Sequence, residues 1–285
     1  MTGLLLSQTR GMLRRLDLKA KKRLGQHFLI DEAVLQKVVA AAEVSDTDTV
    51  VEVGPGLGVL TRELAKRAGR VVAVELDDRL AAILKRETAA FGNVTVVNKD
   101  ILKTAPSELL GGQAAGYKVV ANLPYYITSA VLRYFLEASP KPRLMVVMIQ
   151  KEVAQTIAAA DGKMSLLSVS VQLYGKPEII CRVPAASFYP PPEVDSAILK
   201  IEVYDRPALD VEDVGAFFTL VRAGFCARRK QLANSLAQGL GLPRDEAQSV
   251  LEEAGITAKR RAETLSIEEW GRLWQAFSRR QNDNA

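Results

Sequence analysis

Residues 50–58 read VVEVGPGLG, an apolar run that ends in three glycines at alternate positions. The run predicts a buried strand, and the glycines let the chain turn sharply and pass close to a ligand that any Cβ would exclude. Val59 stands where the dinucleotide fingerprint G-x-G-x-x-G requires its third glycine, so that fingerprint is not met. The stretch favours a nucleotide-type ligand. Taken alone, it also fits a tight connection between a strand and a helix.

On both sides of this stretch, strand-like apolar runs alternate with amphipathic helical stretches. This alternation predicts an α/β fold, with a mostly parallel sheet and helices on both of its faces. Segments 178–183 and 197–203 are expected to add an antiparallel pair at one edge. The predicted strands are 50–53, 70–75, 94–98, 118–121 and 144–149, and the predicted helices between them are 59–68, 79–89, 129–137 and 151–159.

Strand signals stop after residue 204, and a small all-α domain is expected to follow. The predicted division is a basic amino-terminal arm at 1–30, an α/β domain at 31–204 and a helical domain at 205–285. The helices expected in the last domain are 217–226, 231–238, 245–254 and 267–277.

Two carboxylates follow the next two predicted strands. Glu75 ends the second strand, 21 residues beyond Gly54, close to the distance at which an acid meets ribose hydroxyls in open α/β sheets. Asp100 ends the third strand. There its carboxylate could accept a hydrogen bond from an adenine amino group, with the backbone of Ile101 beside it. Either acid alone often serves only as a cap, but both share the ligand-binding edge with the glycine turn. Together they predict an adenosine cofactor without phosphates, and S-adenosyl-L-methionine fits that description.

The fourth predicted strand runs into KVVANLPYYITS at 118–129. Asn122 supplies an amide oxygen, Pro124 fixes a turn, and Tyr125 offers a flat ring. The Asn122 side chain and a main-chain carbonyl of Leu123 or Pro124 suit the exocyclic amine of a planar base, and they orient its lone pair toward a methyl group. In-line displacement on a sulfonium then depends mainly on positioning. The stretch predicts amine methylation; an Asn cap beside core tyrosines is the alternative.

Composition excludes several classes of protein. The apolar runs are too short to cross a membrane, so we expect a cytoplasmic protein without membrane contact. Cys181 and Cys226 lie in no metal-binding or disulfide spacing, and we expect both thiols to be buried. His27 is the single histidine of the chain, which argues against metal sites and against nucleophile–histidine mechanisms.

Positive charge is concentrated at the amino terminus. Residues 1–30 hold seven Lys or Arg and one Asp, a net charge of +6, whereas the whole chain carries +5. This imbalance favours contact with the phosphates of a nucleic acid. A solvated tail and a targeting peptide are the alternatives.

Six motifs follow one another along almost the whole chain: KKRLGQHFLID (21–31), VEVGPGLGVLT (51–61), VANLPYYITS (120–129), SFYPPPEVDSAI (187–198), RRKQLANSL (228–236) and RAETLSIEEW (261–270). In this order they resemble the motifs of the KsgA/RsmA family, the bacterial 16S rRNA adenine N6-dimethyltransferases. The resemblance implies a Rossmann-like class I SAM-dependent methyltransferase domain, followed by a small helical rRNA-binding domain. It also implies that two methyl groups are transferred to N6 of each of two adjacent adenosines in the 3′-terminal hairpin loop of small-subunit rRNA, during ribosome assembly.

By the same resemblance, the target adenine lies between Tyr125 and Phe188, which is similar to the family's second stacking ring. Many relatives carry Asn at the position of His27. The substrate is implied to be 16S rRNA within an immature small subunit, and we expect a monomer. The implied cofactor residues are His27, Leu29, Gly54, Gly56, Glu75, Asp100, Ile101 and Asn122. The predicted RNA-binding residues are Lys21, Lys22, Arg23, Arg228, Arg229 and Lys230, for which a solvated surface is the alternative.

Other functions stay open at this point. A large-subunit rRNA adenine N6-methyltransferase that confers antibiotic resistance has similar catalytic motifs, although RRKQLANSL and RAETLS argue against it. The basic amino terminus is compatible with a mitochondrial relative that also acts as a transcription factor. A noncatalytic ribosome assembly factor would not need the complete set of cofactor residues.

Overall fold

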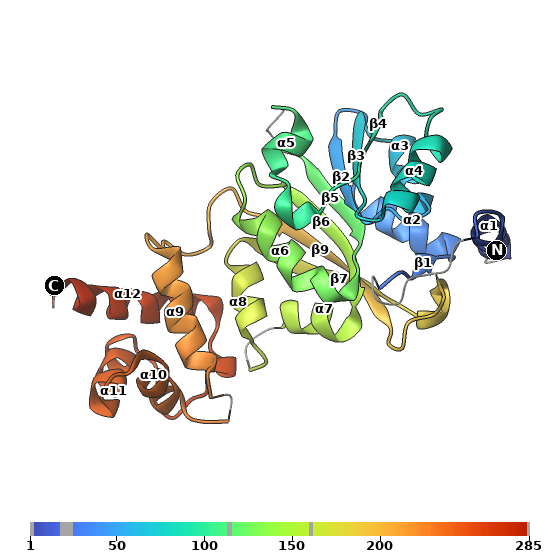
Figure 1. The fold of residues 1–285 in the computed structure, drawn as a ribbon. Helices are drawn as coiled ribbons and strands as arrows, with labels where there is room; N and C mark the ends of the chain where they lie inside the picture. Colours follow the sequence, from blue (N-terminus) through green and yellow to red (C-terminus); the bar gives the residue numbers. More distant parts are fainter. Residues whose placement is uncertain (1–2, 18–24, 113–115, 160–161, 228, 284–285) are drawn as a thin grey trace. The chain divides into compact units, whose positions relative to one another are not determined.

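The computed structural model describes residues 3–17, 25–112, 116–159, 162–227 and 229–283. The chain forms two compact units (Figure 1). Unit 1 comprises Met1–Ala154 and Lys176–Val203, and unit 2 comprises Gln155–Gly175 and Tyr204–Ala285. This division differs from the predicted one, because a segment inside the predicted α/β domain belongs to the helical unit.

A seven-stranded sheet forms the centre of unit 1, in the order β4-β3-β2-β5-β6-β9-β7. The first five strands in this order, from β4 through β3, β2 and β5 to β6, run parallel to one another. Strand β9 is antiparallel to β6. The predicted mostly parallel sheet with an antiparallel edge is therefore confirmed. The strands are β2 (Thr49–Val53), β3 (Arg70–Val74), β4 (Val94–Val97), β5 (Lys118–Asn122), β6 (Leu144–Gln150), β7 (Gly175–Val183) and β9 (Ser196–Val203).

Helices cover both sides of this sheet, with α2, α3 and α4 on one side and α5 and α6 on the other (Figure 1). The helix α2 was not predicted; its buried Val34, Leu35, Val38 and Val39 form the apolar stripe of an amphipathic helix, and Asp31 caps its amino terminus. The helices are α2 (Glu32–Ala41), α3 (Val59–Ala65), α4 (Asp78–Glu87), α5 (Pro106–Leu110), α6 (Thr128–Glu137) and α7 (Lys151–Ile157), and the 3-10 turns are η2 (Ile101–Lys103), η3 (Tyr125–Ile127), η4 (Ala185–Ser187) and η5 (Ala262–Thr264).

The parallel strands are buried on both faces, which explains why they read as continuous apolar runs. Val50, Val71, Val120 and Val146 are fully buried in one core cluster with residues of α2 and α3. Because the strands are parallel, the carboxyl ends of β2, β3 and β5 lie at one edge of the sheet. Gly54 follows β2, Glu75 follows β3, and Asn122 is the last residue of β5.

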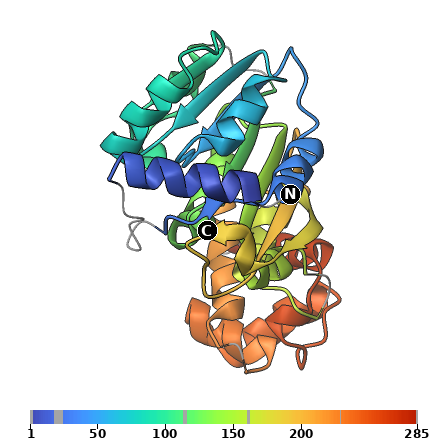
Figure 2. The same cartoon turned by 90° about the vertical axis from the view of Figure 1, so that its right-hand side faces the viewer.

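Part of the predicted amino-terminal arm is folded onto unit 1. Helix α1 (Gly3–Arg15) lies across this unit, in dark blue in Figure 2. Its Leu13 is buried in a cluster with Phe28, Leu57 and Leu80. Strand β1 (Phe28–Leu29) pairs antiparallel with β8 (Phe188–Tyr189), with Leu29 opposite Phe188.

Unit 2 contains the four predicted carboxyl-terminal helices and one helix, α8, that was not predicted. A Cβ at Gly224 would lie 2.5 Å from the ring of Trp270, so glycine allows the close packing of α9 on α12. The helices are α8 (Leu166–Gln172), α9 (Val214–Phe225), α10 (Leu232–Leu240), α11 (Arg244–Glu253) and α12 (Ile267–Asp283).

Three expectations from composition can be compared with the described residues. The prediction that both thiols are buried is wrong for Cys226, which is exposed just beyond α9, and Cys181 is half-buried. None of the described helices is long and apolar enough to cross a membrane. In the same part of the chain, no group of three or more His, Cys, Asp or Glu could hold a metal ion.

Candidate active site

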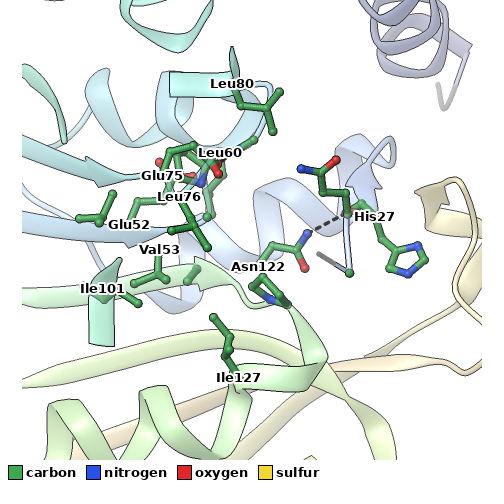
Figure 3. A pocket seen from close by; sticks show the side chains of 18 of the residues that line it. His27, Glu52, Val53, Leu60, Glu75, Leu76, Leu80, Ile101, Asn122 and Ile127 are labelled. Carbon is green, nitrogen blue, oxygen red and sulfur yellow. Dashed lines mark hydrogen bonds between the residues drawn. The ribbon is translucent and has the colours of Figure 1, made fainter. Parts of the chain in front are cut away.

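A cavity of about 210 Å³ opens at the carboxyl edge of the parallel strands in unit 1. Its wall combines the turn after β2, the ends of β3 and β5, the start of η2 and the segment around β1 (Figure 3). The structure brings all eight predicted cofactor residues into this one wall. They are His27, Leu29, Gly54, Gly56, Glu75, Asp100, Ile101 and Asn122.

The glycine turn after β2 forms the floor of the cavity. Gly54 and Gly56 have φ values of +66° and +56°, in the left-handed region that favours glycine. A Cβ at Gly56 would also stand 3.1 Å from Cε1 of Phe28. These positions therefore need glycine for the backbone to turn, and they leave the turn open to a ligand.

Glu75 joins two segments of the cavity wall. Its Oε2 accepts from the Gly56 amide at 3.0 Å and its Oε1 accepts from the Asp77 amide at 2.9 Å. The side chain is buried, and burial raises the pKa of this carboxyl above its usual value. Each oxygen retains a lone pair after these bonds, so the carboxylate can still accept from a pair of ribose hydroxyls.

Asp100 holds the opposite part of the wall. Its Oδ1 accepts from the Leu102 amide at 3.0 Å and so caps η2, which places the buried Ile101 in the cavity lining. The second carboxylate oxygen lies 3.9 Å from Nζ of Lys103. Leu76, half exposed, also lines the cavity. An apolar slot with one acceptor at its end suits adenine and its amino group.

Glu52 lines the cavity as well, although the sequence analysis did not select it as a site residue. The side chain is 1% exposed, and within the described part of the chain its Oε2 has no hydrogen-bond partner. Burial raises the pKa of Glu52 to about 8, and the negative charge of Glu75 acts in the same direction. An unpartnered buried acceptor is unusual and fits a donor on a positively charged ligand. Its position in the sequence, two residues before Gly54 of the glycine turn, was the available signal.

Asn122 is held in one orientation. Its Nδ2 donates to the main-chain carbonyl of His27 at 3.0 Å, drawn as a dashed line in Figure 3. Since a carbonyl can only accept, this bond leaves Oδ1 of Asn122 as an acceptor for another group. Pro124, also in the lining, already accepts from the Ile127 amide at 3.2 Å through its carbonyl. Leu123 is not among the lining residues, and its side chain is buried.

Tyr125 lies beside the cavity and not in its lining. Its hydroxyl is 2.7 Å from Oγ of Ser196, a fully buried residue, and burial raises the pKa of the phenol. Its ring is nearly parallel to the imidazole of His27. The neighbouring Tyr126, which the sequence analysis did not select, is 57% exposed and lines the cavity.

The structure does not bring Phe188 into the cavity wall. Its side chain is 2% exposed and belongs to a core cluster that includes Leu29 and Val183. Pairing of β8 with β1 turns the ring into the interior of unit 1. Phe188 therefore lies outside the cavity lining, and the sandwich of adenine between Tyr125 and Phe188 stays a prediction.

The predicted RNA-binding residues are described only in part. Lys21, Lys22, Arg23 and Arg228 lie outside the described residues. Arg229 and Lys230 are exposed on unit 2, where Nζ of Lys230 donates to Oε1 of Gln238 at 3.1 Å.

Comparison with known proteins covers almost the whole chain. Residues 17–278 match the family described as ribosomal RNA adenine dimethylase. A protein of Dehalococcoides mccartyi strain 195, named ribosomal RNA small subunit methyltransferase A, is 55% identical over 277 residues, which are 97% of this chain and 95% of that protein.

Two solved structures are also similar. A dimethyladenosine transferase from Plasmodium falciparum is 25% identical with a TM-score of 0.77, over 90% of this chain and 98% of that one. The 23S rRNA methyltransferase ErmE is 30% identical with a TM-score of 0.71, over 88% of this chain and 99% of that one.

Proposed function

Because the chain belongs to the ribosomal RNA adenine dimethylase family, we propose that it transfers methyl groups from S-adenosyl-L-methionine to N6 of two adjacent adenosines in 16S rRNA. The observation that carries this proposal is the single cavity lined by the eight cofactor residues, with the Asn122–Tyr125 turn at its side. The small-subunit substrate is the one in the name of the 55% identical relative. The target adenosines are those of the 3′-terminal hairpin loop.

The residues that line the cavity suit the chemistry of the cofactor. S-adenosyl-L-methionine supplies a methyl group on a positively charged sulfur. Glu75 accepts from the ribose hydroxyls, and Asp100 accepts from the adenine amino group beside Ile101. The glycine turn permits close approach of the backbone, and the buried Glu52 faces the positive charge of the ligand. Leu29 supplies apolar surface, and His27 contributes through its main chain.

The residues after β5 orient the target amine. Oδ1 of Asn122 and the carbonyl of Leu123 accept the two N6 hydrogens, and Pro124 fixes the turn that presents them. With its hydrogens held this way, the nitrogen turns its lone pair toward the methyl group. Tyr125 stacks on the base and limits its rotation. Positioning of this kind accounts for the reaction without a strong general base, because the proton leaves after methyl transfer.

The adenosines are methylated in 16S rRNA that is part of an immature small subunit. The reaction takes place in the cytoplasm, and the enzyme acts as a monomer. Lys21, Lys22 and Arg23 contact RNA phosphates, as do the basic residues at the start of the RRKQLANSL motif, Arg228, Arg229 and Lys230. Such contacts hold the RNA in place, whereas the flipped base is recognised in its pocket. The exposure of Arg229 and Lys230 supports this role.

The alternatives are less well supported. Identity to ErmE is 30%, against 55% for the small-subunit enzyme, so a 23S rRNA target is not favoured. A noncatalytic assembly factor would have no need of a cavity that retains all eight cofactor residues.

The decisive experiment is mass spectrometry of both rRNAs after incubation of immature small subunits and, separately, large subunits with the protein and isotopically labelled S-adenosyl-L-methionine. We expect labelled N6,N6-dimethyladenosine in the 3′-terminal fragment of 16S rRNA. Label in the large-subunit rRNA alone would establish the rival activity. Absence of label from both rRNAs, with cofactor bound, would support the noncatalytic function.

A further inference from the structure

Helix α1, which lies across unit 1 in Figure 2, packs against residues of the cofactor cavity. Its Leu13 is buried in a small cluster with Phe28, Leu57 and Leu80. All three partners line the cavity, whereas Leu13 is not among the lining residues. Leu5, near the start of the helix, is buried as well. The apolar face of α1 therefore supports the cavity wall without contributing to the surface that a ligand meets.

Phe28 connects this packing to the glycine turn. A Cβ at Gly56 would stand 3.1 Å from Cε1 of Phe28, so the ring lies close against the turn. The Gly56 amide donates to Oε2 of Glu75 at 3.0 Å, and Glu75 is the carboxylate assigned to the ribose. Leu13 is thereby connected to Glu75 through Phe28 and Gly56. A change in the docking of α1 would reach a group that binds the ligand.

Polar contacts hold α1 on both sides of Leu13. Towards the carboxyl end, Nη2 of Arg79 on α4 donates to the main-chain carbonyl of Leu16 at 3.1 Å. The end of a helix leaves such carbonyls without an intrahelical partner, and a positive charge there is favourable to the helix dipole. On the other side, Cζ of Arg10 lies 5.0 Å from the centroid of the Tyr189 ring. Strand β8, which carries Tyr189, pairs with β1, which carries Phe28.

We infer that Leu13 is a positioning residue for cofactor binding, and that docking of α1 holds Phe28 and the glycine turn in the arrangement that binds the ligand. The inference rests on the assignment of this cavity to S-adenosyl-L-methionine in the proposed function. The segment that matches the family begins at residue 17, so α1 lies outside it. Coupling between two binding events is reciprocal. Docked α1 therefore favours bound cofactor, and bound cofactor favours docked α1.

Three substitutions and one control separate positioning from general stability. Leu13→Ala removes the apolar contact with the cluster, and Leu13→Met keeps most of its volume. Arg79→Ala removes the donor to the Leu16 carbonyl and leaves the cluster intact. Leu109→Ala is the matched control, because Leu109 is similarly buried in unit 1 but lies on α5, outside the cavity lining.

Two measurements on the full chain test the inference. Titration calorimetry gives the affinity for S-adenosyl-L-methionine, and denaturant unfolding gives the stability of each variant. We expect Leu13→Ala to weaken cofactor binding at least about fivefold, the lower end of the usual range for coupled sites. Arg79→Ala should weaken binding by less, and Leu13→Met should bind almost as the unmodified protein does. Leu109→Ala should lose stability but keep the unmodified affinity.

The second measurement is hydrogen exchange of the α1 backbone amides, followed by mass spectrometry with and without saturating cofactor. Because the coupling is reciprocal, the cofactor should slow exchange in α1 of the unmodified protein, and it should do so less in Leu13→Ala. A role in stability alone would not produce this effect. The comparison within the unmodified protein also decides the question if Leu13→Ala does not fold.

Three results would overturn the inference. Folded Leu13→Ala could bind the cofactor with unmodified affinity. Leu109→Ala could lose as much affinity as Leu13→Ala, which would mean that any loss of stability weakens binding. Exchange in α1 could be the same with and without cofactor.

The assignment of the cavity is tested separately. If the unmodified protein does not bind S-adenosyl-L-methionine, or if folded Glu75→Ala binds it with unmodified affinity, the proposed cofactor site is wrong and this inference is wrong with it. If Glu75→Ala weakens binding and any of the three results above is found, the cofactor site stands and only the role of α1 is overturned.

Discussion

At the scale of single residues, Glu75 combines a structural and a ligand-binding role. Its two carboxylate oxygens connect the Gly56 amide in the first turn to the Asp77 amide after β3. Burial raises its pKa, and these two donors oppose that effect by stabilising the charged form. Ribose hydroxyls would add two further donors to the same carboxylate.

The first prediction concerns cofactor affinity. Glu75→Ala should weaken S-adenosyl-L-methionine binding at least about tenfold, because hydrogen bonds to a charged acceptor contribute about 1.5–3 kcal/mol. Glu75→Gln keeps an acceptor oxygen and should lose less. Titration calorimetry measures both, and circular dichroism checks the fold. An unchanged affinity in folded Glu75→Ala would remove this residue from the cofactor site.

The second prediction separates Asn122 from Tyr125. Asn122→Ala should lower the single-turnover rate by about 10²–10³, the usual loss for one hydrogen-bond partner of a transition state, with a smaller effect on RNA affinity. Tyr125→Phe loses the bond to Ser196 but keeps the ring and should stay largely active, whereas Tyr125→Ala should lose most turnover. The rates are compared at saturating RNA and cofactor. A rate for Asn122→Ala within a few-fold of the unmodified rate, or Tyr125→Phe as inactive as Tyr125→Ala, would refute the role of that residue.

At the scale of one element, a buried acid lies at each end of β2, and the pKa values of these two acids are shifted in opposite directions. Asp48, just before the strand, accepts from Nζ of Lys118 at 3.0 Å, from Arg143 at 2.5 Å and from the Ser45 amide at 2.8 Å. Burial alone would raise the pKa of Asp48, but these donors outweigh it and lower the pKa to about 2. At the cavity end, Oε2 of Glu52 has no hydrogen-bond partner among the described residues, and burial raises the pKa of Glu52 to about 8.

The third prediction is that isosteric changes at these two positions alter stability in opposite directions. Ionised Asp48 stabilises the fold by about 2 kcal/mol above pH 4, and this contribution disappears as the pH falls toward 2. Asp48→Asn should therefore be less stable at pH 7. The folded state favours protonated Glu52. This residue therefore lowers the free energy of unfolding increasingly as the pH rises from 4.5 to about 8, by up to about 5 kcal/mol. Glu52→Gln should remove that cost.

Denaturant unfolding without cofactor, at pH 5 and pH 9, measures both effects. We expect Glu52→Gln to gain stability relative to the unmodified protein mainly at pH 9, and Asp48→Asn to lose stability at both values. Equal pH dependence in Glu52→Gln and the unmodified protein would mean that Glu52 titrates normally.

At the scale of the whole molecule, attraction of a polyanion depends more on how charge is distributed along the chain than on the net charge. The net charge of +5 is exceeded by the +6 of the first thirty residues, so the remainder of the chain is close to neutral. A polyanion such as rRNA would therefore be attracted chiefly by local basic segments.

The fourth prediction tests those segments. Replacement of Lys21, Lys22 and Arg23 by Ala should weaken binding to every RNA tested and flatten its salt dependence, by roughly one unit of log–log slope per lost phosphate contact or somewhat less. Lys66→Ala is the control, because that lysine already pairs with Glu63 at 2.5 Å. The measurement is RNA affinity from low to moderate salt. A slope equal to that of the unmodified protein would show that the three residues do not contact phosphates.

The amino-acid sequence by itself determined the seven strands of the main sheet, most of the helices and the edge of the sheet that holds the site, but not helices α1, α2, α5 and α8. These features depend on local rules. Buried parallel strands read as apolar runs, glycines with positive φ mark the turn after β2, and successive parallel strands present Glu75, Asp100 and Asn122 at a common edge. Local patterns were insufficient for residues 155–175: α8 was not predicted, and no sequence pattern indicated that this segment belongs to the helical unit.

Only the tertiary structure decided which aromatic rings lie near the cavity. The bond from His27 to Pro190 spans 163 positions, and the bond from Asn122 to His27 spans 95. Pairing of β1 with β8 buries Phe188 and leaves His27 beside Tyr125, a result that no local pattern contains. The physical reason is that side-chain alternation is local, whereas the register between two strands distant in sequence is set by how the whole unit buries its apolar surface.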